Sequence, residues 1–350
     1  MLRTLILMIF FLSPLYGFSQ ESIPPNIIMM IGDGMGLSQI SSGMYSNNNY
    51  TSLERSHHIG LIKTHSFDNL ITDSAAAGTA MSSGTKTNNR VVGMDENFSP
   101  VKSILEILRD KGYMTAIIAT STIVHATPAS YYSKVKSRYE YDEIASQLSK
   151  SNINFFVGGG EKHFNDRRDK RNLINEMDDY LFANSLESFI KINSNKIGFL
   201  TNYDDPIGKH EGREPSLEDM VQATLQKLSS FNKPFFLLVE GSQIDWGGHD
   251  NDSEHLISEM LEFDRTVGVV FDFANKDKNT TVVITADHET GGLSITDGNL
   301  EDSKVVSKYV SEDHTGTMVP IFSFGPYSSL FNGIYDNTEI FDKLEAIIIK

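Results

Sequence analysis

Three apolar stretches of strand length each stop at an acidic residue, and this pattern limits the possible folds more than any other feature of the chain. These stretches and the residues that end them are 27–32 with Asp33, 235–239 with Glu240, and 281–286 with Asp287 and His288. Because the carboxyl ends of parallel strands meet at one edge of a sheet, we expect these side chains to lie together. A fourth segment, Asp313-His314-Thr315-Gly316, offers another metal-type ligand. The sequence therefore predicts a ligand-rich site at the carboxyl edge of a mostly parallel sheet.

Strand-like and helix-like stretches alternate along the rest of the chain. Strands are expected at 26–32, 114–121, 153–157, 235–239, 281–286 and 319–324, and helices at 101–111, 216–229, 253–274 and 338–348. This βα order predicts an α/β three-layer sandwich, with a central mostly parallel sheet flanked by helices. The length of 350 residues suits one large domain, which we place at 20–350. The least periodic stretch, 161–215, is expected to cover or border the site.

The N-terminus has the layout of a cleavable signal peptide, which we assign to residues 1–19. Arg3 precedes an apolar run from Leu5 to Leu12, and small residues such as Ser19 follow. The run is shorter than the roughly 20 residues that a membrane-spanning helix needs, so no membrane span is expected in the mature chain. The expected location of the protein is the periplasm or the exterior.

Composition excludes several kinds of site and partner. The chain has no cysteine, which rules out disulfides, thiolate zinc sites and cysteine nucleophiles. Its net charge of −16 argues against nucleic acid as a partner, because phosphate backbones bind basic surfaces. The same charge would repel an anionic substrate unless bound divalent cations and an arginine reversed the local potential.

A serine at the start of a predicted helix is the candidate nucleophile. The segment 72–84 predicts a helix that begins at Ser74, is capped by Asp73 or Thr72, and stops at Gly84. The amides and the dipole at a helix N-terminus favour an anion such as a phosphoryl group. The chain has no G-x-S-x-G elbow to suggest a Ser-His-Asp triad, but a divalent metal can activate a hydroxyl instead.

Six blocks, taken together, resemble the alkaline phosphatase family and follow the order in which that family carries them. They are Gly32-Asp33-Gly34-Met35-Gly36; Thr72-Asp73-Ser74-Ala75-Ala76; Ala126-Thr127-Pro128-Ala129 followed by Ser137-Arg138; Val239-Glu240-Gly241 with Ile244-Asp245 and His249; Thr285-Ala286-Asp287-His288; and His314-Thr315-Gly316. The blocks cover almost all of the mature chain. The resemblance implies a phosphoric monoester hydrolase that acts on small phosphate monoesters, and the family commonly forms homodimers.

The resemblance also implies three metal sites. A first zinc ion would be held by Asp245, His249 and His314, and the i, i+4 spacing of the first two suits one helical turn. A second zinc ion would take Asp33, Asp287 and His288. A magnesium ion would take oxygen ligands from Asp33, Thr127 and Glu240. Ser74 would form a phosphoserine intermediate, Arg138 would bind the phosphoryl oxygens, and Asp73 would orient Arg138.

Two positions depart from the pattern that bacterial relatives often show. His125 stands where many have Asp, so the metal preferred at the third site is in question, and Trp246 stands where many have Lys, so a cationic contact to phosphate is missing. Only 25 residues separate His288 from His314, which leaves little room for an inserted surface domain. The resemblance therefore points to a compact member of the family.

Other functions fit the sequence less well than this one. A phosphodiesterase or phosphonate hydrolase of the same superfamily would lack the third site, whereas Thr127 and Glu240 are both present. A sulfatase is disfavoured because the chain contains no C-x-P-x-R or S-x-P-x-R motif. A secreted, non-catalytic protein that binds metal or phosphate is the remaining alternative, and loss of Ser74 or of a ligand would have favoured it.

Overall fold

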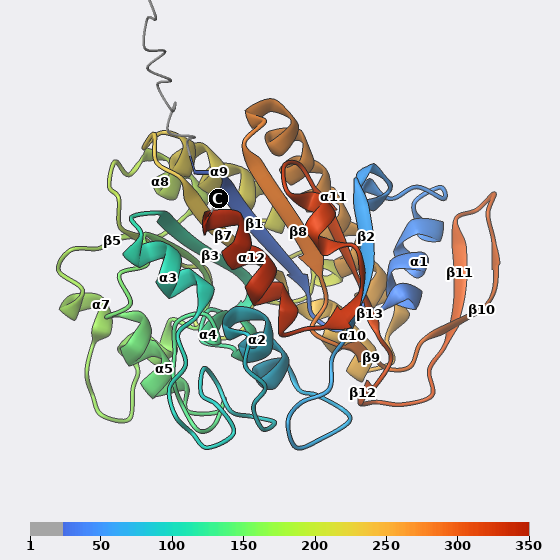
Figure 1. Ribbon diagram of the computed structural model, residues 1–350, viewed down its shortest axis with the longest axis horizontal. Coiled ribbons are helices and arrows are strands. Elements are labelled where there is room, and N and C mark those ends of the chain that lie inside the picture. The colour runs from blue at the N-terminus through green and yellow to red at the C-terminus, as the bar shows by residue number, and fades with distance from the viewer. Residues whose placement is uncertain (1–23, 350) are drawn as a thin grey trace, which may run out of the picture.

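A computed structural model describes residues 24–349, so the predicted signal peptide lies outside the described residues. The fold is built on a ten-stranded sheet with helices on both faces (Figure 1), in the order β14-β2-β13-β8-β1-β7-β3-β4-β6-β5. The strands of this sheet are β1 (Asn26–Gly32), β2 (His58–Lys63), β3 (Met114–Thr122), β4 (Phe155–Gly159), β5 (Leu181–Ala183), β6 (Ile197–Leu200), β7 (Phe235–Gly241), β8 (Thr280–Thr285), β13 (Val319–Phe324) and β14 (Gly333–Asp336).

The sheet is mostly parallel, as predicted. Among the described residues, seven of its nine neighbouring strand pairs are parallel, and both antiparallel pairs involve β13. Helices cover both faces, and they are α1 (Leu37–Ser46), α2 (Ser74–Ser83), α3 (Ile104–Asp110), α4 (Ala126–Ala129), α5 (Tyr141–Leu148), α6 (Lys162–Asn165), α7 (Leu173–Glu176), α8 (Leu186–Lys191), α9 (Leu217–Ser229), α10 (Gln243–His249), α11 (Ser253–Asp277) and α12 (Glu339–Ile349). The predicted three-layer α/β sandwich is confirmed.

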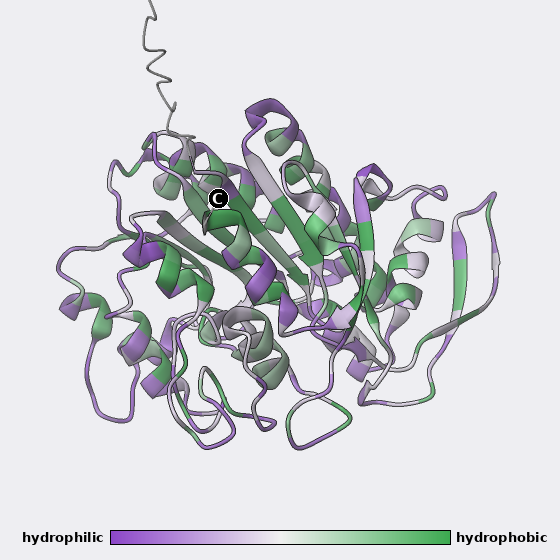
Figure 2. Cartoon of the chain, in the orientation of Figure 1, coloured by the Kyte–Doolittle hydropathy of each residue, from purple (hydrophilic) through white to green (hydrophobic). Residues whose placement is uncertain are grey.

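The central strands are apolar along their whole length because neither of their faces meets water. Every residue of β1, β7 and β8 is buried. Figure 2 shows the hydrophobic colour concentrated on these strands and on the inner sides of the helices. A parallel sheet covered on both faces produces such continuous apolar runs, which is why these strands could be predicted.

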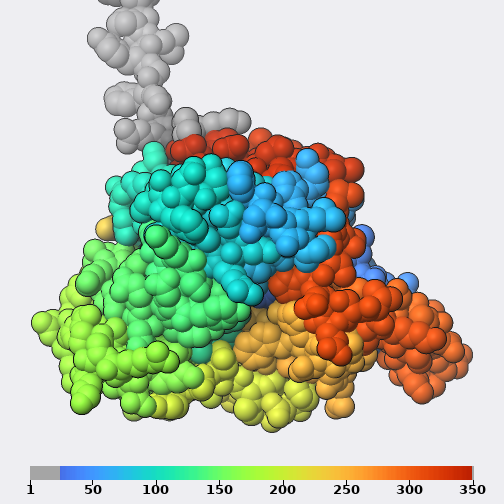
Figure 3. Space-filling view, turned by 90° about the horizontal axis from the view of Figure 1, so that it is seen from below, coloured from blue at the N-terminus to red at the C-terminus, as the bar shows by residue number. Residues whose placement is uncertain are grey.

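Several short elements were not predicted. Strands β2, β5, β6 and β14 have three to six residues and extend the sheet at its two edges. The stretch 161–215, which was expected to cover or border the site, supplies edge strands β5 and β6. A separate hairpin of β10 (Ser294–Asn299) and β11 (Lys304–Lys308) projects from the body (Figures 1 and 3). Two-residue strands β9 (Glu289–Thr290) and β12 (His314–Thr315) pair with each other.

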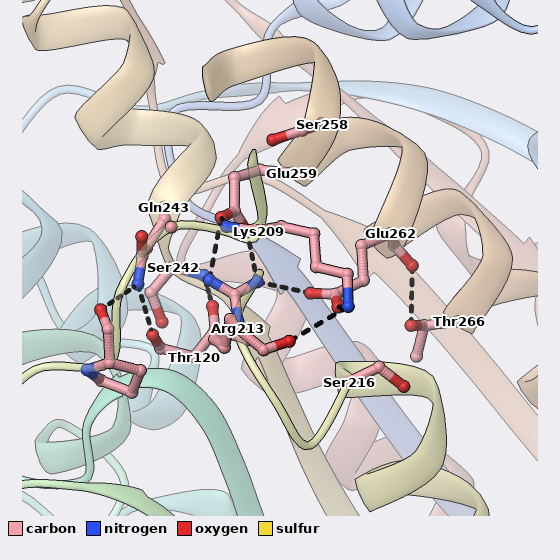
Figure 4. Close-up of polar contacts among 12 residues, drawn as sticks. Thr120, Lys209, Arg213, Ser216, Ser242, Gln243, Ser258, Glu259, Glu262 and Thr266 are labelled. Carbon is pink, nitrogen blue, oxygen red and sulfur yellow. Dashed lines mark hydrogen bonds and ion pairs between the residues drawn. The ribbon is translucent and has the colours of Figure 1, made fainter. Parts of the chain in front are cut away.

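A buried ionic cluster ties the loop before α9 to the long helix α11 (Figure 4). The guanidinium of Arg213 donates to both carboxylate oxygens of Glu259, at 2.8 and 2.6 Å, and also pairs with Glu262. All three side chains are at most 3% exposed. Lys209 adds a second cation, 3.3 Å from Glu262. The two carboxylates in the cluster are therefore matched by two cations.

Replacing Arg213 with alanine is expected to lower the free energy of unfolding by about 3–5 kcal/mol. The change leaves Glu259 and Glu262 buried with an incomplete set of partners, and such uncompensated buried charges are strongly destabilising. The matched control is Arg265→Ala on α11, where an exposed pair with Glu218 is lost and a change below about 1 kcal/mol is expected. Urea unfolding of the two variants measures the difference, and equal small effects would show that the cluster adds little stability.

None of the helices formed by residues 24–349 has both the length and the hydropathy that crossing a membrane requires.

Candidate active site

The three strands that end in acidic residues lie side by side in the sheet, with β1 between β7 and β8. Ile31 of β1 is aligned with Glu240 on one side and with Thr285 on the other. Asp33, Glu240 and Asp287 therefore emerge at the same edge, and their side chains are completely buried. The predicted convergence of ligands at the carboxyl edge is what the structure shows.

Glycine lets the turn after β1 pack directly on helix α10. Gly34 has φ +75°, and a Cβ atom built there would lie 2.7 Å from the Cα atom of Asp245. Any larger residue would push these two segments apart or strain the backbone. The amide of Gly34 also donates to Asp287 Oδ1 at 3.1 Å. This close packing brings the Asp33 turn next to the Asp245 side chain.

The predicted set Asp245, His249 and His314 forms a compact cluster. Asp245 Oδ1 lies 3.4 Å from His249 Nε2 and 3.5 Å from His314 Nε2. Both histidines also contact a backbone carbonyl through Nδ1, those of Glu312 and Thr72 respectively. Such contacts orient the rings and leave Nε2 directed inward, as is typical of histidine ligands. The three ligand atoms lie within 4.8 Å of one another.

The pKa values in this cluster reflect strong mutual attraction. The hydrogen bond between His249 and Asp245 raises the pKa of His249 to about 9, although burial opposes this rise. Although burial raises the pKa of Asp245, hydrogen bonds from His249 and His314 hold it well below the usual range. A metal ion would replace the protons that these histidines hold, because histidine binds metal as the neutral imidazole.

The second predicted set lies next to the first, with the His288 ring stacked on the His314 ring at 3.5 Å between centroids. His288 Nε2 is 3.5 Å from Asp33 Oδ1 and 3.2 Å from Asp287 Oδ2, and all three side chains are fully buried. Asp245 also belongs here by distance, since its carboxylate, that of Asp33 and the His288 ring come within 4.8 Å of one another. Burial raises the pKa of Asp287 to about 6, with Asp245 adding to the rise.

Within residues 24–349, the buried carboxylate of Asp33 lacks the hydrogen-bond donors that would stabilise its negative charge. Neither of its carboxylate oxygens accepts a hydrogen bond within the described part of the chain, although both are buried. Burial raises its pKa well above the usual range, and repulsion from Asp287 adds to the increase. A buried carboxylate without hydrogen-bond donors is costly, so its place among other ligands indicates metal binding.

The third predicted set contains Asp33, Thr127 and Glu240, and His125, which the sequence linked to this set, lies next to it. Ligand atoms of Asp33, His125 and Glu240 lie within 4.8 Å of one another. Thr127 lies on α4 and is fully buried. Burial raises the pKa of Glu240 to about 8, while the Thr127 and Ser242 hydroxyls oppose that rise.

Ser74 begins helix α2, as predicted. Asp73 is the N-cap and accepts a hydrogen bond from the Ala76 amide at 2.9 Å, and Gly84 ends the helix in the left-handed conformation with φ +69°. The Ser74 hydroxyl lies 3.3 Å from His288 Nε2 and 3.5 Å from Arg138 Nη1. The candidate nucleophile therefore faces the second ligand set.

Arg138 reaches the same point from the loop before α5. Its Nη1 atom donates to Asp73 Oδ2 at 3.1 Å, and its Nη2 atom lies 3.3 Å from His125 Nε2. Burial lowers the pKa of Arg138, but the charges of Asp73 and Asp33 and the hydrogen bond to Asp73 act against it, and the net shift is upward, so the guanidinium stays charged. The predicted pairing of Asp73 with Arg138 is present.

The site opens into a cavity of about 770 Å³ that is lined by Ser74, Arg138, His125, Trp246, His249 and His314, among others. Trp246 is on α10 and packs edge-on against His125, with 6.3 Å between ring centroids. Among the described residues that line the cavity, none comes from 161–215. A hollow of about 870 Å³ between α9 and α11 contains none of the predicted site residues.

The sequence did not predict Thr290 or several residues of the cavity wall as parts of the site. The Thr290 hydroxyl donates to Asp245 Oδ1 and lies 3.2 Å from His288 Nδ1, so it links two ligand sets. Its signal in the sequence is weak, because one threonine two residues after a ligand has many other uses. The wall residues Arg90, Tyr139 and Tyr141 belong to loops or helix ends that only the tertiary fold brings here.

Comparison with known proteins decides which family this site belongs to. A model of the family described as alkaline phosphatase matches residues 25–308. The chain belongs to the alkaline phosphatase family. Alkaline phosphatase 4 of Bacillus subtilis (strain 168) is 33% identical, over 90% of this chain and 86% of that protein. This membership makes the chain a phosphoric monoester hydrolase.

Solved alkaline phosphatase structures have the same fold. The enzyme of the Antarctic bacterium TAB5 is 39% identical, covers 93% of this chain and 99% of its own, and superposes with a TM-score of 0.89. A variant of that enzyme with a histidine replaced by aspartate is described as having Mg bound in the M3 site. That structure is 37% identical, covers 93% of this chain and 98% of its own, and has a TM-score of 0.88.

Proposed function

We propose that this phosphoric monoester hydrolase is an exported enzyme that works through a phosphoserine on Ser74 at a site for two zinc ions and one magnesium ion. The observation that carries the proposal is the convergence of three ligand sets at one edge of the sheet, with a serine at a helix N-terminus facing the second set. Export rests on the leader-like residues 1–19. Binding of metal ions is supported by the buried carboxylates and by the inward-facing histidine nitrogens described above.

The donor atoms fit this choice of metals. Asp245, His249 and His314 offer one oxygen and two nitrogens, and Asp33, Asp287 and His288 offer oxygen and nitrogen, which suits zinc. Asp33, Thr127 and Glu240 offer only oxygen, which suits magnesium. Divalent cations in these positions would make hydroxyl groups and water more nucleophilic and would neutralise charge on the phosphoryl and leaving-group oxygens.

The residues of the chain then carry out two displacements at phosphorus. Ser74 Oγ forms a bond to phosphorus while the bond to the leaving alcohol breaks, and water later forms the new bond as the Ser74 Oγ–phosphorus bond breaks. The guanidinium of Arg138 holds two non-bridging oxygens, and Asp73 keeps that guanidinium oriented. The α2 N-terminus favours the added negative charge on Ser74.

A substrate comparison tests the proposal against the diesterase alternative. A diesterase of the superfamily would lack the third set, whereas this chain has Thr127 and Glu240. The monoester p-nitrophenyl phosphate should therefore be hydrolysed far faster than the diester bis-p-nitrophenyl phosphate. Both substrates release the same chromophore, which allows kcat/KM to be compared directly. Faster hydrolysis of the diester would assign the site to the diesterase class instead.

Replacing Arg138 with alanine is expected to weaken transition-state binding by about 1.5–3 kcal/mol, the range for a charge-assisted hydrogen bond. Inhibition by inorganic phosphate should weaken as well, because product and substrate share the oxygens that Arg138 would hold. Arg109→Ala is the control, since Arg109 lies on α3 and binds the Ser151 carbonyl and Asp110. Unchanged kcat/KM together with unchanged phosphate inhibition would remove Arg138 from the site.

Replacing His125 with aspartate is expected to tighten magnesium binding at the third site. Arg138 can only donate, so His125 Nε2 accepts from it, and the ring then holds its proton on Nδ1. Burial and then the charge of Arg138 lower the pKa of His125 to about 3, so the ring is neutral. An aspartate would supply an anion beside Asp33 and Glu240, which a hard cation prefers.

Calorimetric titration of zinc-loaded protein with magnesium compares His125→Asp with the wild type. The magnesium-bound histidine-to-aspartate variant of the TAB5 enzyme supports the expectation, on the proposal that its histidine corresponds to His125. Superimposable binding curves would show that His125 does not influence the third metal.

A further inference from the structure

Arg90 is a cation at the active-site cavity that the proposed mechanism does not use. It lines the same cavity as Ser74 and Arg138, and its side chain is exposed. Within residues 24–349 its guanidinium makes no ion pair and no hydrogen bond, whereas Arg138 is paired with Asp73. An unpaired cation beside the site is notable in a chain whose net charge is −16.

The backbone holds Arg90 firmly in this position. Its φ of 73° lies in the left-handed region, which is unfavourable for a residue with a Cβ atom. Its carbonyl accepts a hydrogen bond from the Arg138 amide at 2.7 Å. The neighbouring Asn89 accepts from the Asp73 amide at 3.1 Å and donates to the Ile71 carbonyl at 2.9 Å. Arg90 is thus tied to the segments that carry both Asp73 and Arg138, and such strain often marks a functional position.

The cavity has room for more than the phosphoryl group. Its volume is about 770 Å³, and Tyr139, Tyr141 and Trp246 contribute aromatic surface to its wall. With the phosphoryl group held between Ser74 and Arg138, the rest of the substrate must occupy the remaining space. Among the described residues that line the cavity, Arg90 is the arginine left for that part of the substrate, because Arg138 is already committed to the phosphoryl oxygens.

We propose that Arg90 binds a second anionic group, a carboxylate or another phosphoryl, on the leaving group of the substrate. The preferred substrates are then phosphate monoesters or anhydrides whose leaving group is itself negatively charged. A guanidinium suits either anion, since its planar donors match two oxygens at once. This inference rests on the proposed function of Ser74 and Arg138, and it adds the class of leaving group.

Two matched substrate pairs test the proposal. 3-Phosphoglycerate and glycerol 3-phosphate differ by one carboxylate on the leaving group, and adenosine diphosphate and adenosine monophosphate differ by one phosphoryl group. For each pair, the ratio of kcat/KM for the anionic to the neutral leaving group is measured in wild type and in Arg90→Ala. The ratio is expected to fall about tenfold, the effect of losing one charge-assisted contact. A fall in only one pair identifies which anion Arg90 binds.

Further variants separate a direct contact from other effects. Arg90→Gly suits the positive φ and provides a truncation that should fold even if alanine is not tolerated. Arg90→Lys should keep part of the preference as a point charge. Lys136→Ala removes an equal charge from an exposed side chain that lies over Phe98 and does not line the cavity, so the ratios should stay at the wild-type values.

The possible outcomes are distinct. Ratios that do not change in Arg90→Ala and Arg90→Gly would overturn the proposal, and so would an equal fall in Lys136→Ala, which would indicate a general field. Addition of salt should reduce the wild-type preference and leave the Arg90→Gly ratio nearly constant, because screening weakens exposed charge contacts. Failure of the wild type to hydrolyse p-nitrophenyl phosphate would instead contradict the proposed function.

Discussion

Removal of divalent metal ions is expected to abolish hydrolysis of p-nitrophenyl phosphate, and zinc with magnesium is expected to restore it. Without cations, the buried carboxylates of Asp33, Asp287 and Glu240 repel one another, and burial already raises the pKa of each above its usual value. The same acidic edge would repel a phosphate ester. Bound cations would reverse that potential and supply most of the charge neutralisation that phosphoryl transfer needs.

The loss should also appear in stability, because ligands that bind only the folded state stabilise it. The melting temperature is therefore expected to fall on chelation and to recover with zinc and magnesium. The control is enzyme treated with a chelator that was itself saturated with zinc beforehand. This enzyme should keep its activity. Full turnover by protein shown to be metal-free by elemental analysis would refute the metal requirement.

Replacing Ser74 with alanine is expected to reduce kcat by roughly a thousandfold or more, which corresponds to about 4 kcal/mol in activation free energy. The variant loses the nucleophile but keeps the ligands, so weak hydrolysis by water should persist. Ser83→Ala is the matched control on the same helix, because the Ser83 hydroxyl is bonded to the Thr79 carbonyl and does not line the cavity.

A covalent label identifies the nucleophile independently of the rate. Wild-type enzyme incubated with inorganic phosphate and quenched in acid should carry one added phosphoryl group on the peptide that contains Ser74. Ser74→Ala should carry none, and Ser83→Ala should be labelled as the wild type is. A phosphoryl group found on a different residue of the wild-type enzyme would transfer the nucleophilic role to that residue.

Local patterns were enough to predict the parts of the site that depend on short stretches of chain. The apolar runs before Asp33, Glu240 and Asp287 are continuous because their strands are buried on both faces, so these strands could be recognised. The helix that begins at Ser74 could be predicted because a cap and a stop are properties of a few adjacent residues. The i, i+4 spacing of Asp245 and His249 likewise corresponds to a single helical turn.

Features that depend on pairing between distant segments could not be predicted in this way. Strand β5 has only three residues and exists because it pairs with β6, and β2 pairs with β13 across more than 250 residues of sequence. Nothing in the sequence distinguishes Arg213 from a charged surface residue, and only the fold places it against Glu259 and Glu262. Thr290 and Arg90 likewise become part of the site only because the fold brings them next to residues that are distant in the sequence.

By itself, the sequence determined the α/β class, the ligand types at the strand ends and the candidate nucleophile, because each is encoded in local periodicity or in adjacent residues. Only the tertiary structure decided that Asp245 contacts two ligand sets and that His125 lies close to Asp33 and Glu240. It also decided that Arg90 lines the cavity without an ion pair to any residue in 24–349. The physical reason is that burial, charge pairing and hydrogen bonding between side chains depend on distances in space. Those distances are set by packing of the whole chain, and spacing along the sequence does not contain them.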